Sequence, residues 1–362
     1  MERILALTVV VLLCVIAGLP ADQAADLNAR ADSADPVRGV VPLPVIGYSP
    51  EDGLILGGAA LFFSVPYPGA PTDTVSTNLI YGTAGTFSAN LITDHRVGAG
   101  LTLQTEARAG RSVGEFFGIG MDADAEEQFT QLRLASAASL LFPLSERMRI
   151  GPSYQLSYLN VLETDAGGAL ETGELRGSDY TVATGPGARA VYDSRDSNVY
   201  PGRGLYADVD VRGYPFWLGS SDTFWRSRLD TRYFVSLAPS LILGGQTVLL
   251  QSGGDVPFQY LPTIGGGNTL RGVLEGRYRD SVSFSTQAEL RFPLVWRFGA
   301  VAFGGAGRVA SSLDALGLDD IATAAGLGLR FAVNPEQRLN IRVDLAHNGE
   351  DLSVYVNFQE AF

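Results

Sequence analysis

The amino-acid sequence predicts an all-β protein, and specifically a sixteen-stranded antiparallel transmembrane β-barrel. From about residue 43 to Phe362, segments of about ten residues carry an apolar residue at every second position. Successive strand side chains point to opposite faces, so each segment has one apolar and one polar face. After the N-terminal region, no apolar run reaches the ~18 residues that a membrane-spanning helix needs. A closed sheet satisfies its own backbone hydrogen bonds in lipid, which makes it the expected spanning structure.

The segment from Trp225 to Leu237 shows this alternation most clearly. Its apolar face carries Trp225, Leu229, Tyr233, Val235 and Leu237, and its polar face carries Arg226, Arg228, Asp230 and Arg232. A barrel with lipid outside and water inside gives this pattern, and so does a soluble sandwich of two sheets. The alternation alone does not separate the two folds.

The first residues are typical of a secretory signal peptide, which we place at 1–24. Glu2 and Arg3 precede an uninterrupted apolar run from Ile4 to Ala17, and small residues follow it. The single cysteine, Cys14, lies within this run. The exported chain is therefore expected to contain no disulfide and no cysteine ligand for a metal.

After the signal peptide, residues 25–42 are expected to form a short periplasmic segment, and residues 43–362 the barrel. We predict strands at residues 43–49, 53–65, 74–83, 86–93, 97–108, 126–142, 146–159, 181–192, 204–213, 224–237, 240–252, 281–293, 296–305, 322–332, 338–346 and 352–360. Their even number is the one that bacterial single-chain barrels have.

The predicted connections alternate in length. Short turns are expected at Asp94-His95-Arg96, Phe142-Pro143-Leu144, Ala238-Pro239, Pro293-Leu294 and Asn334-Pro335, and longer linkers at 109–125, 160–180, 213–223, 253–280 and 306–321. Outer-membrane barrels have short periplasmic turns and long extracellular loops. Both chain ends are therefore expected on the periplasmic side of a bacterial outer membrane.

The formal net charge of −13 argues against nucleic acid as a partner. Acidic loops that face outward would account for the charge, and so would a lumen that favours cations.

One linker carries a motif that can be compared with a known family. The run Gly265-Gly266-Gly267-Asn268-Thr269-Leu270-Arg271-Gly272-Val273, followed by Gly276-Arg277-Tyr278-Arg279-Asp280, resembles the sixth extracellular loop of BamA/TamA-type barrels, the bacterial surface antigen family. Val273 replaces the aromatic residue of that family. Three further stretches agree in order and position: Phe116-Phe117-Gly118-Ile119-Gly120, Tyr192-Asp193-Ser194-Arg195-Asp196 with Pro201-Gly202-Arg203-Gly204, and Gln287-Ala288-Glu289-Leu290-Arg291-Phe292-Pro293-Leu294.

The resemblance implies a site in the lumen built on Leu270, Arg271 and Gly272. In the family this loop tip folds back into the barrel, where an arginine presents several N–H donors to wall carboxylates. Glu289 matches the first wall partner. The second would be an aspartate at the position of Gly305, which carries no carboxylate here. We therefore expect Arg271 to pair with Glu289, with Asp344 as a more distant partner.

The resemblance also implies a function. Family members act in the insertion or translocation of proteins at the outer membrane, through a lateral seam between the first and last strands. The chain has no room for a POTRA domain before the barrel, so it resembles a barrel-only form. Expected partners are outer-membrane lipid, unfolded outer-membrane protein clients and periplasmic proteins, with no cofactor, no metal and no catalytic residue.

Two other functions stay open at this stage. The first is a passive outer-membrane channel or porin. The second is an outer-membrane hydrolase, for which His347 and Asp344 with a loop serine are the only candidate arrangement. Asp122, Asp124, Glu126 and Glu127 also form an acidic loop, for which a solvated surface is favoured over a cation site because the calcium-loop pattern is absent.

Overall fold

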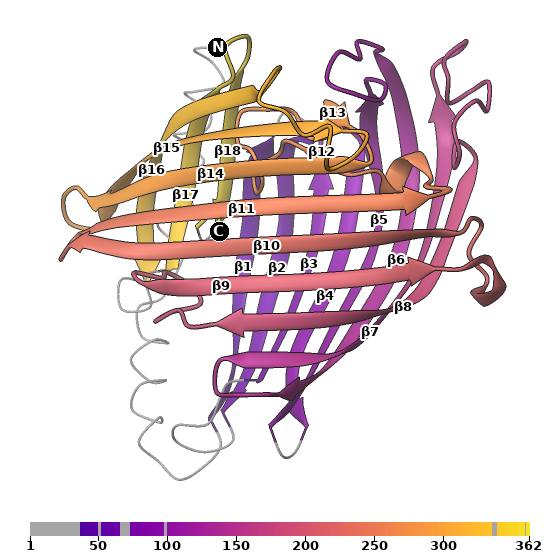
Figure 1. Cartoon of the computed structure of the whole chain (residues 1–362). Helices are drawn as coiled ribbons and strands as arrows, with labels where there is room; N and C mark the ends of the chain where they lie inside the picture. Colours follow the sequence, from indigo (N-terminus) through magenta and orange to yellow (C-terminus); the bar gives the residue numbers. More distant parts are fainter. Residues whose placement is uncertain (1–36, 50–51, 66–72, 98–99, 335–338, 359) are drawn as a thin grey trace.

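The computed structural model describes residues 37–49, 52–65, 73–97, 100–334, 339–358 and 360–362. The predicted signal peptide at 1–24 and the segment up to residue 36 lie outside these ranges. Sixteen antiparallel strands form one sheet, whose hydrogen-bonded order follows the chain from β1 to β18 with β12 and β13 left out. Figure 1 shows these strands curving around a common interior as a barrel.

The strands of the sheet are β1 (Val37–Ser49), β2 (Gly53–Val65), β3 (Asp73–Gly82), β4 (Thr86–Val97), β5 (Leu101–Phe116), β6 (Glu127–Pro143), β7 (Met148–Thr164), β8 (Tyr180–Asp193), β9 (Gly204–Tyr214), β10 (Phe224–Ala238), β11 (Leu241–Gly254), β14 (Val282–Pro293), β15 (Phe298–Ala310), β16 (Ala322–Asn334), β17 (Leu339–His347) and β18 (Leu352–Phe358). Each overlaps one of the sixteen predicted strands, so the predicted fold class is confirmed.

The two faces of β10 show why alternation predicts this fold. Asp230 is fully buried and faces the lumen, whereas Tyr233 and Val235 are 41% and 49% exposed on the outer face. Because lipid covers the outer face of such a barrel, exposed apolar side chains there cost nothing.

Several predicted boundaries differ from the structure. The short turn expected at Asp94-His95-Arg96 is wrong, because β4 continues to Val97 and Asp94 accepts a hydrogen bond from Gln104 of β5 at 2.8 Å. The linker expected at 109–125 is also wrong in its first half, since β5 continues to Phe116. A Cβ at Gly114 would come within 3.3 Å of the Phe129 ring, so the glycine makes room for a side chain within the strand. β1 begins at Val37, before the expected residue 43.

The two ends of the barrel differ in the length of their connections. One end carries the long loops 117–126, 165–179, 215–223, 255–281 and 311–321, and we call it the loop end. The other end carries turns such as 144–147 and 294–297, and we call it the turn end. Trp217 is 79% exposed at the loop end and Trp296 is 76% exposed at the turn end. Aromatic residues at both ends are typical of the interfacial girdles of membrane barrels.

The first and last strands lie beside each other. A Cβ built on Gly47 of β1 would come within 2.8 Å of the Val356 carbonyl oxygen of β18. In the described part of the chain, however, the hydrogen-bonded strand order starts at β1 and ends at β18, with no register joining the two.

The long loop 255–281 has secondary structure of its own. It contains the 3-10 turn η2 (Phe258–Tyr260) and the two-stranded sheet of β12 (Thr263–Ile264) and β13 (Tyr278–Arg279). A second 3-10 turn, η1 (Phe216–Leu218), lies in the loop between β9 and β10. Among the described residues, no helix has the length and apolarity to cross a membrane.

Candidate functional site

The loop 255–281 folds back against the inner wall of the barrel. Gly265 and Gly266 adopt φ values of 109° and 81°, which glycine reaches without steric cost, and they turn the chain after β12 toward the lumen. The tip residue Leu270 is buried with Ile264 and Val273 from the same loop and with Val309 and Ala324 from the wall.

Arg271, at the tip of this loop, is fully enclosed. Its Nη2 donates to Glu289 Oε2 at 2.7 Å, its Nη1 to Asp344 Oδ2 at 3.0 Å, and its Nε to Gln287 Oε1 at 3.2 Å. The guanidinium carbon also lies 3.8 Å from the centroid of the Phe303 ring. The structure thus brings Arg271, Glu289 and Asp344 together, and Asp344 is a direct partner rather than a distant one.

The two carboxylates have further cationic partners. Glu289 Oε1 accepts from Arg291 Nε at 2.7 Å, and Asp344 Oδ1 accepts from Arg330 Nη1 at 2.5 Å. Arg342 lies 3.5 Å from Asp344. Burying an unpaired charge is costly, so the loop arginine and the wall groups depend on one another for compensation.

The neighbours of Arg271 explain why small residues surround it. Gly272 has φ 107°, and a Cβ there would lie 2.9 Å from Ala324 Cβ and 3.1 Å from Ala346 Cβ. A Cβ at Gly305 would lie 2.8 Å from Leu270 Cδ1 and 2.7 Å from the Thr286 carbonyl oxygen. The missing carboxylate at Gly305 therefore leaves room for Leu270, while Asp344 on β17 contacts the arginine instead.

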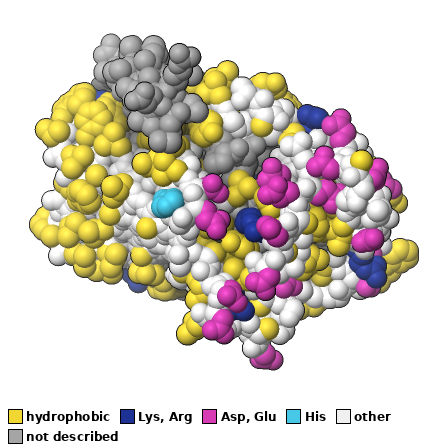
Figure 2. Space-filling model, turned by 90° about the horizontal axis from the view of Figure 1, so that it is seen from above, with side chains coloured by type: hydrophobic (Ala, Val, Ile, Leu, Met, Phe, Trp, Pro, Cys, Tyr) yellow, Lys and Arg dark blue, Asp and Glu magenta, His cyan; other side chains and the backbone are white. Residues whose placement is uncertain are grey.

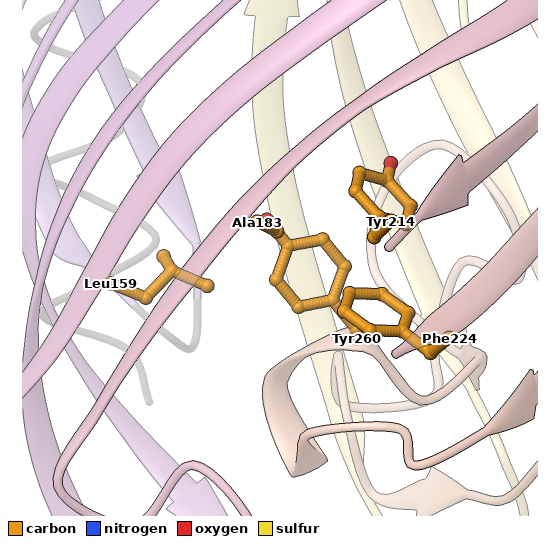
Figure 3. Close-up of a cluster of buried hydrophobic side chains, with 5 residues drawn as sticks. All are labelled: Leu159, Ala183, Tyr214, Phe224 and Tyr260. Carbon is orange, nitrogen blue, oxygen red and sulfur yellow. The ribbon is translucent and has the colours of Figure 1, made fainter. Parts of the chain in front are cut away.

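A second part of the loop is held by aromatic packing. Tyr260 lies against Tyr214 and Phe224, with ring centroids 5.7 and 5.1 Å apart, and Leu159 and Ala183 complete the cluster (Figure 3). Phe258 packs edge-on to Phe116 and Phe129 at 5.7 and 5.5 Å. The sequence analysis did not identify this aromatic anchor. The signal that could have revealed it is the pair of aromatic residues two positions apart, Phe258 and Tyr260, in a polar loop.

The Phe116 to Gly120 stretch contacts the same loop. Gly120 N donates to the Arg279 carbonyl oxygen at 2.8 Å, and Arg277 Nη1 donates to the Ala123 carbonyl oxygen at 2.6 Å. Arg279 Nη1 donates to the Phe258 carbonyl oxygen at 2.9 Å. Burial lowers the pKa of Arg279 to about 10, which still leaves it charged at neutral pH.

The stretch from Tyr192 to Asp196 forms the turn between β8 and β9. Asp196 Oδ1 accepts from the backbone N–H groups of Gly202 at 2.9 Å and Arg203 at 3.3 Å. Arg195 pairs with Asp193 at 2.8 Å. Aspartate side chains therefore hold this turn.

The contacts of Arg271 belong to a chain of polar contacts along the inner wall, which we call the lumenal network. It branches at Arg271 and contains Asp94, Gln104, Arg189, Asp208, Arg228, Asp230, Gln246, Gln287, Arg271, Glu289, Asp344, Arg330 and Glu360, with successive contacts between 2.5 and 3.8 Å. It connects β4 to the residues that follow β18. Alternation predicted the inward direction of several of these side chains, but not which of them meet across the lumen.

The candidate hydrolase residues are not arranged for catalysis. His347 is exposed and its Nδ1 lies 2.7 Å from the Asp351 carbonyl oxygen, whereas Asp344 is buried among arginines. In the acidic loop, Glu127 is buried and its carboxylate accepts from the Leu170 N–H at 3.0 Å. Within the described ranges, no group of three or more His, Cys, Asp or Glu residues could hold a metal ion.

Comparisons with known proteins agree with this geometry. The model of the Omp85 superfamily domain matches residues 69–356. Among solved structures, BamA from Haemophilus ducreyi lacking POTRA domains 1–3 superposes with a TM-score of 0.61 at 12% identity, covering 90% of this chain and 70% of that one. CdiB from Acinetobacter baumannii gives a TM-score of 0.52 at 9% identity, covering 90% and 60%. Comparison with curated protein sequences gives no match.

Proposed function

Because the chain belongs to the Omp85 superfamily, we propose that it inserts or translocates proteins at the bacterial outer membrane through a lateral seam between β1 and β18. The family consists of non-enzymatic assembly and transport barrels of the outer membrane. Its membership confirms the resemblance to BamA/TamA-type barrels drawn from the loop motif. The lateral seam and its clients are the specific content of the proposal.

The observation that carries the proposal is that, among the described residues, no register joins the two end strands. β1 pairs with β2 without interruption from Val37 to Ser49, yet it contains Pro42 and Pro44. Proline has no N–H to donate. Because the two prolines are two residues apart, the positions of their missing N–H groups lie on the same side of β1. The ladder to β2 is intact, so this side is not the one that faces β2 but the one that faces β18. The seam therefore lacks two donors.

A seam of this kind can act without a cofactor. An unpaired strand edge offers N–H and C=O groups to another extended segment, so an unfolded client strand can pair with it in the membrane plane. Meanwhile the loop tip at Arg271 fills part of the lumen. We infer that clients use the lateral path, with outer-membrane lipid on one side and periplasmic partner proteins delivering them.

The test is a cross-link across the seam. Residues 37–362 contain no cysteine, so new cysteines react alone. Ile46 of β1 and Val356 of β18 lie on the same outer face, near Gly47. We expect Ile46→Cys/Val356→Cys, joined by a short thiol cross-linker, to lose assisted folding of a small outer-membrane barrel into proteoliposomes.

The control is Ile46→Cys/Leu56→Cys, which links a pair already opposed in the ladder of β1 and β2. This cross-link should leave the activity unchanged. Equal activity of the seam-locked and free proteins would show that clients do not use the seam.

A passive channel is the second candidate, and one observation favours it. A cavity of about 1430 Å³ occupies the lumen toward the loop end. Conductance decides between the two functions, as described in the Discussion.

A further inference from the structure

The cavity toward the loop end has a basic inner wall beneath an acidic rim. Its inner wall includes Arg108 on β5, Arg133 on β6 and Arg226 on β10, and Arg279 reaches it from the loop 255–281. The acidic residues that line the cavity are Asp52, Glu115, Glu275 and Asp351, at or near the ends of strands and in loops. Figure 2, viewed from above, shows acidic side chains gathered over one part of the molecule. Charge thus changes sign from Asp52, Glu115 and Asp351 near the strand ends to the arginines of the wall. Glu275 is the exception, because it lies on the inward-folded loop 255–281 near Arg279.

Two of these arginines have no acidic partner among the residues that the structure describes. Arg108 pairs with Glu106, but Arg133 and Arg226 form no ion pair in the described part of the chain. By contrast, each arginine that surrounds Glu289 and Asp344 lies within 3.5 Å of one of those carboxylates. Arg133 is exposed and Arg226 is half-buried, so both guanidinium groups are open to a ligand in the cavity. The half-buried charge of Arg226 has no counter-ion to offset its partial loss of water.

Both arginines lie near the same aromatic cluster. The Arg226 guanidinium carbon lies 5.3 Å from the centroid of the Tyr260 ring. Tyr260 packs in one cluster with Leu159 (Figure 3). Leu159 is the register partner of Arg133 in the ladder of β6 and β7, so Arg133 starts from the wall beside this cluster.

One further donor of the cavity lining is unsatisfied. Arg279 Nε is buried and has no hydrogen-bond partner in the described structure. A buried donor without a partner is costly, so the lining is incomplete without an acceptor.

We propose that this cavity binds the oxyanion group, a phosphate or carboxylate, of a small ligand between Arg133 and Arg226. Guanidinium groups bind such groups through two parallel hydrogen bonds, and partial exclusion of water strengthens the attraction. Arg279 Nε supplies a further donor. A long polyanion would have to pass the acidic rim and would be repelled by it. A compact ligand with fewer charges is repelled less. This inference does not depend on the proposed role in protein insertion.

The test uses the purified barrel with inorganic phosphate and citrate as probes, and chloride at matched ionic strength as the reference. We expect calorimetry to detect saturable binding of at least one oxyanion and none of chloride. The phosphate and citrate arms distinguish a phosphoryl ligand from a carboxylate ligand.

Variants then assign the binding to the two arginines. Arg133→Gln and Arg226→Gln should each weaken binding by at least about tenfold, since a hydrogen bond to a charged group contributes that much. Arg226→Lys should retain part of the affinity because it keeps the charge. Arg203→Gln, in an exposed turn at the opposite end, should bind as the wild type does.

Heat-modifiable migration on gels verifies that each variant is folded. Two results would overturn the proposal: no saturable binding of either oxyanion to the wild type, or equal affinity in wild type, Arg133→Gln and Arg226→Gln. If a glutamine variant fails to fold, the wild type is compared with Arg226→Lys instead. Equal oxyanion affinity of these two proteins would contradict bidentate binding by Arg226.

Discussion

Arg271 contributes to stability because its wall partners are buried with it. Replacing it by alanine would leave Glu289 and Asp344 with one charge fewer to compensate them. Removing one partner of a buried ion pair typically costs about 3–5 kcal/mol. We expect Arg271→Ala to lower the free energy of unfolding by an amount in this range, measured by urea titration with heat-modifiable migration as the readout.

The matched control is Arg277→Ala in the same loop. Arg277 pairs at 3.3 Å with Asp124, whose side chain is 86% exposed. The exposed pair contributes only about 0–1 kcal/mol, and the hydrogen bond that Arg277 donates to the Ala123 carbonyl oxygen adds to it. This variant should therefore lose less stability than Arg271→Ala. Equal losses in the two variants would mean that the buried position of Arg271 has no energetic consequence.

Gly272 is constrained both by its backbone and by its neighbours. Gly272→Ala would force a left-handed φ and place a methyl group against Ala324 and Ala346. Gly349→Ala shares the first problem, with φ 100°, but its Cβ would meet nothing within 4 Å. The difference between the two variants isolates the packing cost, which we expect to be about 1–3 kcal/mol.

Trypsin cleavage after Arg277 and urea titration measure the effect of these two substitutions. Gly272→Ala should be cleaved faster and unfold earlier than Gly349→Ala. The same behaviour in both variants would show that the loop tip does not pack closely against the wall.

At the residue scale, the sequence predicted which side chains face the lumen, because alternation along a strand fixes that direction. Alternation along 281–293 places Glu289 inward, and the family motif points to Arg271. Asp344 is also inward by alternation, but its contact with Arg271 depends on how far the loop reaches across the lumen. Gly305 shows the same limit, because its role in making room for Leu270 becomes visible only in three dimensions.

At the element scale, Pro42 and Pro44 set the strength of the seam. Pro42→Thr/Pro44→Thr would restore two N–H donors that face β18. Each new hydrogen bond contributes about 0.5–1.5 kcal/mol, so the seam should become more stable and assisted folding of client barrels should slow. The measurement is the rate of client folding in proteoliposomes.

The control for this variant is Val40→Thr/Ile46→Thr. It introduces threonine at neighbouring positions of β1 whose backbone donors are already present. Its rate should match the wild type. A proline variant that is as fast as the wild type would show that the missing donors do not govern the seam.

The sixteen barrel strands were predictable because lipid and water impose a period of two on every one of them. The short strands β12 and β13 were not, because two residues each cannot show a period. Strand ends were also less predictable than strand centres. Polar and glycine residues near the ends, such as those of β5, suggest loops but belong to the inner wall.

At the scale of the whole molecule, the position of charge separates the two explanations offered for the net charge. Exposed acidic residues are frequent in the loops at the loop end, including Asp122, Asp124, Glu171, Asp319 and Glu350. In the lumenal network the carboxylates are instead paired with arginines, and the cavity wall carries further arginines. The acidic balance therefore reflects the rim more than the interior.

The central claim is a barrel whose lumen is closed by the loop 255–281, held by Arg271 at its tip and by Tyr260 and Phe258 nearer its base. Planar-bilayer conductance of the purified barrel beside its Arg271→Ala variant tests this claim most directly. We predict little conductance for the wild type and frequent large openings for the variant. A wide, steady pore in the wild type, unchanged by Arg271→Ala, would contradict the closed lumen and support a passive channel.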